Sequence, residues 1–117
     1  MHRGERQPKK LALPEPKVEP KFTVEFTEDE LQQLAWLWFA FKRGVGTFQD
    51  IHPAFERMGS NMSGQIYGQA YEYLSVLRAS HKILGRITQK FEADPMTNWR
   101  VLNHLRQFDP KAVKIDF

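Results

Sequence analysis

Apolar and polar residues recur at helical spacing along residues 28–43, which predicts an amphipathic helix there. Thr27 and Glu30 stand at the two positions of a capping box, in which a hydroxyl and a carboxylate satisfy free amides of the first helical turn. Two basic residues followed by Gly44 are typical of a helix C-terminus. The apolar residues that share one stripe of this helix are Leu31, Leu34, Ala35, Trp38 and Phe41.

Two large aromatic residues of the same helix lie off that stripe. Trp36 and Phe39 face away from it, so the helix is apolar on two sides. Such a helix is either central in the core or partly covered by another chain. Because buried aromatic anchors often dominate the energy of a protein interface, Trp36 and Phe39 are the candidate protein-binding residues.

A shorter helix is predicted over residues 51–58. Proline in the interior of a longer helix would remove a hydrogen bond and clash with the preceding turn. We therefore expect a turn over residues 46–50, then a helix that carries Pro53 in its first turn and ends at Gly59.

The longest predicted helix spans residues 63–93. Its apolar seam follows a heptad repeat, which favours antiparallel packing on neighbouring helices. Val76 and Ile83 widen the apolar face beyond what one small domain needs, so a homodimer is a further expectation. The seam consists of Ile66, Ala70, Tyr73, Leu77, Ser80, Leu84, Ile87 and Phe91.

Four basic residues follow one another at intervals of four on the opposite side of that helix, with no acidic residue between Glu72 and Glu92. Like charges at this spacing cost a few tenths of a kcal/mol each in an isolated helix, so they favour an acidic partner. The alternative is a solvated face whose cations pair with acids of neighbouring elements. The candidate nucleic-acid-binding residues, through sequence-independent phosphate contact, are Arg78, Lys82, Arg86 and Lys90.

A fourth helix is predicted over residues 95–107, because a residue before proline avoids the helical region and proline suits the first helical position. The residues expected to point inward from it are Met96, Trp99, Leu102, Leu105 and Phe108.

Strict alternation of apolar and polar residues predicts short strands over residues 22–26 and 113–117. A lone strand needs a partner, so we expect these two terminal segments to pair. The fold class is therefore mainly α: a small four-helix domain with one long central helix over residues 63–93 and a short two-stranded β pairing of the termini.

The N-terminal residues 1–21 form a Pro-rich segment with few large apolar side chains, which predicts a disordered arm before a single helical domain over residues 22–117. The arm carries six basic and three acidic residues, so it accounts for the whole net charge of +3. It is either a solubilising tail or an arm that docks on a partner or on phosphates.

Catalytic chemistry finds little support in the sequence. The chain has no cysteine, which excludes thiolate and disulfide chemistry and agrees with a cytoplasmic location. Its N-terminus does not resemble a secretory signal, and no apolar run approaches the roughly 18 residues of a membrane span. We expect no enzyme activity and no cofactor.

Two local patterns resemble a metal site and a nucleotide site in part. Asp50, His52 and Glu56 lie within two turns, but no second histidine has ligand spacing, and a catalytic metal usually needs three protein ligands. Residues 59–64 have the glycine spacing of a phosphate loop, yet glutamine and isoleucine follow where lysine and a hydroxyl are required. We expect neither a metal site nor a nucleotide site.

The resulting hypothesis is a non-catalytic interaction protein that binds a protein partner as an inhibitor, adaptor or assembly component. Its size and composition are common among small accessory proteins, including those encoded by phages and mobile elements. The alternative is a sequence-independent nucleic-acid-associated protein that uses the basic residues of the third helix together with the arm.

Overall fold

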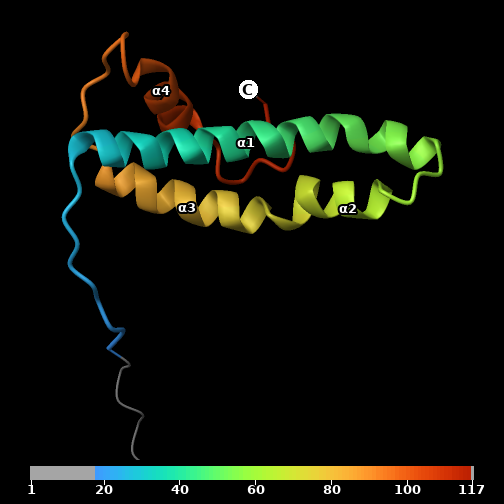
Figure 1. Cartoon of the computed structure of the whole chain (residues 1–117), viewed down its shortest axis with the longest axis horizontal. Coiled ribbons are helices and arrows are strands. Elements are labelled where there is room, and N and C mark those ends of the chain that lie inside the picture. The colour runs from blue at the N-terminus through green and yellow to red at the C-terminus, as the bar shows by residue number, and fades with distance from the viewer. Residues whose placement is uncertain (1–17, 117) are drawn as a thin grey trace, which may run out of the picture.

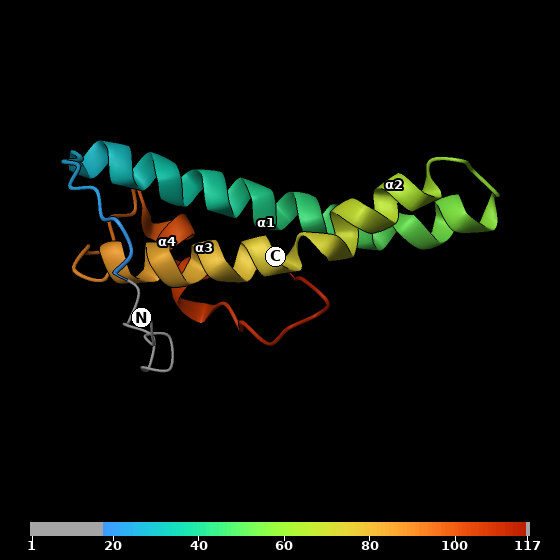
Figure 2. The same cartoon turned by 90° about the horizontal axis from the view of Figure 1, so that it is seen from below.

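The computed structural model describes residues 18–116, and this part of the chain is mainly helical, as predicted. Helix α1 lies alongside α2 and α3, which run back along it, while α4 lies against the N-terminal half of α1 and also contacts α3 (Figure 1). Figure 2 shows the same α1–α3 pair from below. The elements are α1 (Glu28–Arg57), α2 (Ser63–Tyr67), the π-helical turn η3 (Gly68–Glu72), α3 (Leu74–Ile87) and α4 (Trp99–Gln107).

The predicted start of the first helix is confirmed. Glu30 donates its backbone amide to the Thr27 hydroxyl at 3.1 Å, and Thr27 donates its own amide to the Glu30 carboxylate at 2.9 Å. These reciprocal bonds satisfy two amides that a helix end would otherwise leave free.

The predicted end of that helix is wrong. Helix α1 continues through Gly44 and Pro53 to Arg57, so there is neither a turn over 46–50 nor a separate helix over 51–58. Val45 and Gln49 are buried, because this half of α1 packs against α2 and η3. Tertiary packing thus outweighs two local helix breakers. Gly59, with a φ of 68°, does stand just beyond the end of the helix, as predicted.

The continuous helix predicted over residues 63–93 is also wrong. The chain passes through the π turn η3, leaves helical geometry at Tyr73, and ends α3 at Ile87. Ala70 and Leu74 are both buried, whereas Tyr73 is 48% exposed. Ala70, Leu74 and Leu77 follow one another at intervals of four and three, so the buried face passes through Leu74 and not through Tyr73.

Helix α4 begins at Trp99 rather than at Pro95. The residues before it form a turn in which the Asp94 carbonyl accepts from the amides of Thr97, Asn98 and Trp99. The buried Asn98 side chain closes the turn by accepting from the Asp94 amide at 2.7 Å. Leu102 and Leu105 point inward as predicted. Two residues predicted to be inward are instead exposed, Met96 at 88% and Trp99 at 53%.

The predicted β pairing of the termini is not confirmed, since residues 18–116 contain no strand. Residues 22–26 are extended and exposed, and Figure 1 shows this segment leaving the helical body near the start of α1. The C-terminal segment runs instead beside α1, with Ile115 buried. The predicted count of four helices is likewise not confirmed. Most of the predicted arm, residues 1–17, and Phe117 lie outside the described residues.

The core lies where α1, α3 and α4 meet. No helix within residues 18–116 has the length and apolar character needed to cross a membrane. The buried apolar residues that form one contiguous cluster are Ala35, Trp38, Phe39, Val45, Leu74, Leu77, Leu84, Val101, Leu105 and Ile115.

Candidate functional site

An open apolar groove of about 470 Å³ runs between α1 and α3. Its most exposed lining residues are Leu37 at 66%, Val76 at 51% and Ile83 at 51%. On each helix the lining residues follow at intervals of three or four, so each helix has a wider apolar stripe than its contact with the other helix covers. The lining residues are Leu34, Leu37, Trp38, Phe41, Val76, Ser80, Ile83, Leu84 and Ile87.

The floor of the groove is fixed by Trp38, which is 3% exposed. Its indole nitrogen donates to the Leu77 carbonyl at 3.0 Å, and its ring meets Phe108 edge to face at 5.3 Å between centroids. A buried indole that satisfies its N–H in this way holds one orientation. The groove is therefore a preformed surface rather than a gap that its own side chains could close.

Two exposed cations accompany the groove on α3. Lys82 and Arg86 each directly precede a lining residue, Ile83 and Ile87, so they lie about 100° around the helix from it. Neither forms a hydrogen bond or ion pair with any other residue of 18–116. The α3 side of the groove thus has positive charge available to a partner.

The other two members of the predicted basic row do not share this setting. Arg78 is half-buried, and its guanidinium donates to the Ala112 carbonyl at 2.9 Å. Lys90 lies in the turn after α3, because the helix ends at Ile87. Of the four cations predicted to share one exposed helix face, only Lys82 and Arg86 are exposed on α3, and Lys90 lies beyond the end of that helix.

Trp36 and Phe39, the candidate protein-binding residues, pack between α1 and α4, which is the burial within the core that was one of the two alternatives for this side of the helix. Phe39 is 4% exposed, with the His104 ring at 4.6 Å and the Arg100 guanidinium at 5.4 Å. Trp36 is half-buried and donates to the Thr97 carbonyl at 3.3 Å. A partner could reach Phe39 only after α4 had left α1. Both residues lie off the apolar stripe of α1, as predicted, and α4 with the turn before it covers them.

Lys42 is a buried cation that sequence reasoning treated as part of a helix end. It is 5% exposed, contacts His104 Nδ1 at 3.4 Å, and donates to the Asp116 carbonyl. Burial lowers the pKa of Lys42 from its ordinary value, as does Arg43, against the opposing effect of Asp116. Burial, then the neighbouring charges of Lys42, Arg100 and Arg43, also lower the pKa of His104.

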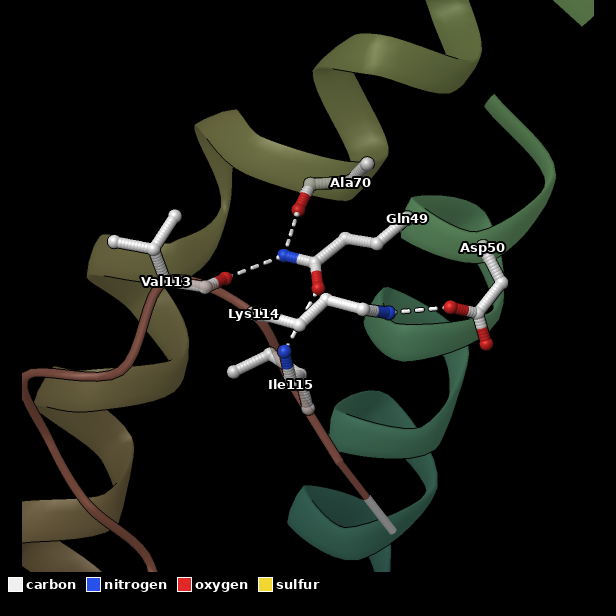
Figure 3. A network of polar contacts seen from close by, with 6 residues as sticks. All are labelled: Gln49, Asp50, Ala70, Val113, Lys114 and Ile115. Carbon is white, nitrogen blue, oxygen red and sulfur yellow. Dashed lines mark hydrogen bonds and ion pairs between the residues drawn. The ribbon is translucent and has the colours of Figure 1, made fainter. Parts of the chain in front are cut away.

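Gln49 is the second buried polar residue that sequence reasoning missed. Its side-chain amide donates to the carbonyls of Ala70 at 3.0 Å and Val113 at 2.7 Å, and its oxygen accepts from the Ile115 amide at 2.8 Å (Figure 3). Gln49 lies four positions after Val45, on the same face of α1. This spacing indicates a buried glutamine only once α1 is known to continue past Gly44.

The residues weighed as a metal site do not converge. Asp50 forms an ion pair with Lys114, and the His52 ring lies against Tyr67 at 5.3 Å. Residues 18–116 hold no group of three or more His, Asp or Glu side chains that could bind a metal ion. Residues 59–62, within the loop weighed for phosphate binding, connect α1 to α2.

Comparison with known proteins places this helical body in a family. Residues 29–107 match the P22AR C-terminal domain, so the chain belongs to the P22AR C-terminal domain family. An uncharacterized protein of Haemophilus influenzae is 73% identical over 70 residues, which cover 60% of this chain. The match covers 34% of that relative, so the chain spans about a third of its length. No solved structure matches the chain.

Proposed function

We propose that this chain is a non-catalytic, cytoplasmic protein-binding domain of a phage-type antirepressor, and that it binds its protein partner in the groove between α1 and α3. The family supports a phage origin, since its name is that of a P22 antirepressor-type domain. An antirepressor inactivates a repressor protein, which requires contact between two proteins.

The observation that carries this proposal is the exposure of the groove. Leu37, Val76 and Ile83 are each at least half exposed on one continuous apolar surface, at a considerable hydrophobic cost for an isolated domain. Covering such a surface with a partner recovers that free energy. The groove therefore has the properties of an interface more than those of a catalytic cleft.

The chemistry of the groove defines the partner segment. Two helices that flank an apolar channel accept an amphipathic helix, which inserts residues spaced by three, four and seven. Lys82 and Arg86 stand on the α3 side, so acidic residues along one flank of the incoming helix would be complementary. The partner is thus expected to present a helix with an apolar stripe and an acidic flank.

Affinity capture from the native source tests this proposal. Leu37 and Ile83 are exposed, so Leu37→Glu with Ile83→Glu should leave the fold intact while placing two carboxylates in the groove. Wild type should recover one protein partner at both 50 and 200 mM salt, with or without nuclease. The amount of partner recovered by the double variant should fall at least about tenfold, because each buried carboxylate would be unpaired.

A matched control keeps the same charge change away from the groove. Gln107→Glu with Lys111→Gln alters two exposed residues at the C-terminal side of α4, and should leave the recovery of the partner unchanged. Equal recovery by the groove variant and the wild type would rule out the groove as the binding surface. Sedimentation of the same variants tests the homodimer: self-association that the groove variant abolishes would make a second copy the occupant.

Nucleic-acid association is the second candidate, favoured by the exposure of Lys82, Arg86 and Lys90. Three phosphate contacts would give a log–log salt slope of about −3, so binding to a random DNA duplex should weaken by a few tens of fold between about 50 and 200 mM salt. Replacing Lys82 and Arg86 by glutamine should abolish that binding and leave protein capture nearly intact. Salt-independent recovery of a protein, with no retention of the duplex, would exclude this alternative.

A further inference from the structure

We infer that α1 and α3 form a second binding site, one for the backbone of a short peptide, which the chain's own segment 112–116 occupies. This site lies apart from the apolar groove and does not depend on the proposed function. Its ligand is a short segment with a buried aliphatic residue, preceded by a basic residue.

The site recognises the segment mainly through its backbone. Gln49 binds the Val113 carbonyl and the Ile115 amide, at 2.7 and 2.8 Å, on either side of Lys114 (Figure 3). Arg78 donates to the Ala112 carbonyl at 2.9 Å, and Lys42 donates to the Asp116 carbonyl. Four backbone groups in five residues are therefore held by three side chains. Main-chain hydrogen bonds are a common source of affinity in peptide recognition.

The polar side chains of this site are buried, and that burial shows what they are suited to bind. Gln49 is 3% exposed and Lys42 is 5% exposed, yet two of the three Gln49 hydrogen bonds and the Lys42 bond to Asp116 go to the segment. A buried polar group without a partner is costly. If the segment left, another backbone that supplies the same carbonyls and amide would satisfy these polar side chains.

Two side chains of the occupant define its sequence preference. Ile115 is 2% exposed and joins the hydrophobic core, while Lys114 points to the other side and pairs with Asp50 (Figure 3). The side chain of Val113 is exposed, the residue being 57% exposed, so it contributes little to the sequence preference. The preferred ligand therefore has a basic residue followed by an aliphatic one, in a backbone that bends before the aliphatic residue as it does at Val113 and Lys114.

The segment follows the part of the chain that holds it. The family match covers residues 29–107, which include Lys42, Gln49, Asp50 and Arg78, whereas segment 112–116 follows the matched region. The residues that bind the segment thus lie within the matched region, and the segment lies after it. A partner segment of the same chemistry would enter by displacing segment 112–116, so the attached segment acts as a competitor.

Peptide binding to the full chain tests this inference. The probe is a fluorescently labelled peptide with the sequence of residues 109–117. Ile115→Asp in the full chain should release the attached segment, because it buries an unpaired carboxylate in place of the isoleucine. The variant should bind the probe saturably and at least about tenfold more tightly than wild type, whose site is filled by a segment at high effective concentration.

Two controls keep the inference falsifiable. The same peptide carrying Ile115→Asp should not bind either chain. Should the Ile115→Asp chain lose its helical circular dichroism, Lys114→Glu decides the question, since it only replaces an exposed ion pair with repulsion from Asp50. That chain should bind the unmodified probe more tightly than wild type. Equal binding of the probe by wild type and a folded variant, or no binding by the variant, would overturn the inference.

Discussion

His104 is the residue whose protonation the fold opposes most directly. Its Nδ1 lies 3.4 Å from the Lys42 ammonium, which can only donate, so the ring must offer a lone pair at this nitrogen. Burial and three neighbouring cations lower its pKa from the ordinary value. The ring also lies against Phe39, at the contact between α1 and α4. Charging it would therefore strain the packing of α4.

The sign of the pH effect follows from linkage. An unfolded His104 takes up its proton near pH 6.5, whereas the folded protein resists protonation to a lower pH. Between these two values the unfolded state binds more protons, so stability rises with pH. The contribution of His104 is fully present above about pH 6.5 and is lost as the pH falls through the folded pKa.

Urea unfolding at pH 7.5 and pH 5.5 measures this effect. Wild type should lose more free energy of unfolding over this interval than His104→Asn, whose side chain does not titrate. The difference between the two proteins isolates His104 from the carboxylates, which titrate in both. An equal loss in both proteins would show that the folded pKa of His104 is not lowered.

At the level of elements, α1 contains a proline whose cost its packing must offset. Pro53 lacks the amide that would bond to the Gln49 carbonyl, which costs about 3 kcal/mol in a helix interior. The half of α1 around it contacts α2 and η3, and this contact keeps the helix continuous.

Replacing Pro53 by alanine should stabilise the protein, because the residue is exposed and alanine restores the missing donor. The gain is expected to be about 2–2.5 kcal/mol, since the roughly 3 kcal/mol cost of the proline is reduced by about 0.4–1 kcal/mol when its restriction on the unfolded chain is lost. Urea denaturation measures the change. Glu56→Ala, an exposed substitution in the same turn, should stay within about 0.5 kcal/mol of wild type. A destabilised Pro53→Ala protein would contradict this account.

Some local signals in the sequence predicted the structure and others did not: the capping box was confirmed, whereas Gly44 and Pro53 do not end α1. The capping box at Thr27 involves residues three positions apart, so its chemistry is complete in the sequence. Tyr73 and Leu74 are both apolar neighbours, and only the contact with α1 decides which one is buried. The burial of Phe39 depends on His104, far away in the chain. No pattern near residue 39 records that contact.

The candidate groove was partly predictable for the same reason. Leu34, Trp38 and Phe41 belong to the predicted apolar stripe, and Val76 and Ile83 were recognised as widening the apolar face of the third helix, whereas Leu37 was not part of the predicted stripe. The peptide site was not predictable. It needs Gln49 in a continuous α1 and segment 112–116 folded back beside it, and the sequence indicated a turn at the first and a strand at the second.

At the scale of the whole molecule, packing is uneven along α1. Its N-terminal half contacts both α3 and α4, whereas its C-terminal half contacts α2 and η3 (Figure 1). No residue between 50 and 65 is fully buried, while Leu77, Val101 and Leu102 are at most 1% exposed. Because burial of apolar surface is the main source of stability, the two halves should not open with the same free energy.

Native-state hydrogen exchange tests this unevenness. Amides of residues 52–66 should exchange at least about tenfold faster, relative to their unfolded rates, than amides of residues 77–84 and 101–105. Their opening should also depend less steeply on added denaturant, since a partial opening exposes less surface than global unfolding. Equal protection and equal denaturant dependence in both regions would instead mean one cooperative unit. Partial opening of this end would loosen η3, whose Ala70 carbonyl holds Gln49, so the same motion would ease the exchange of peptides at the second site.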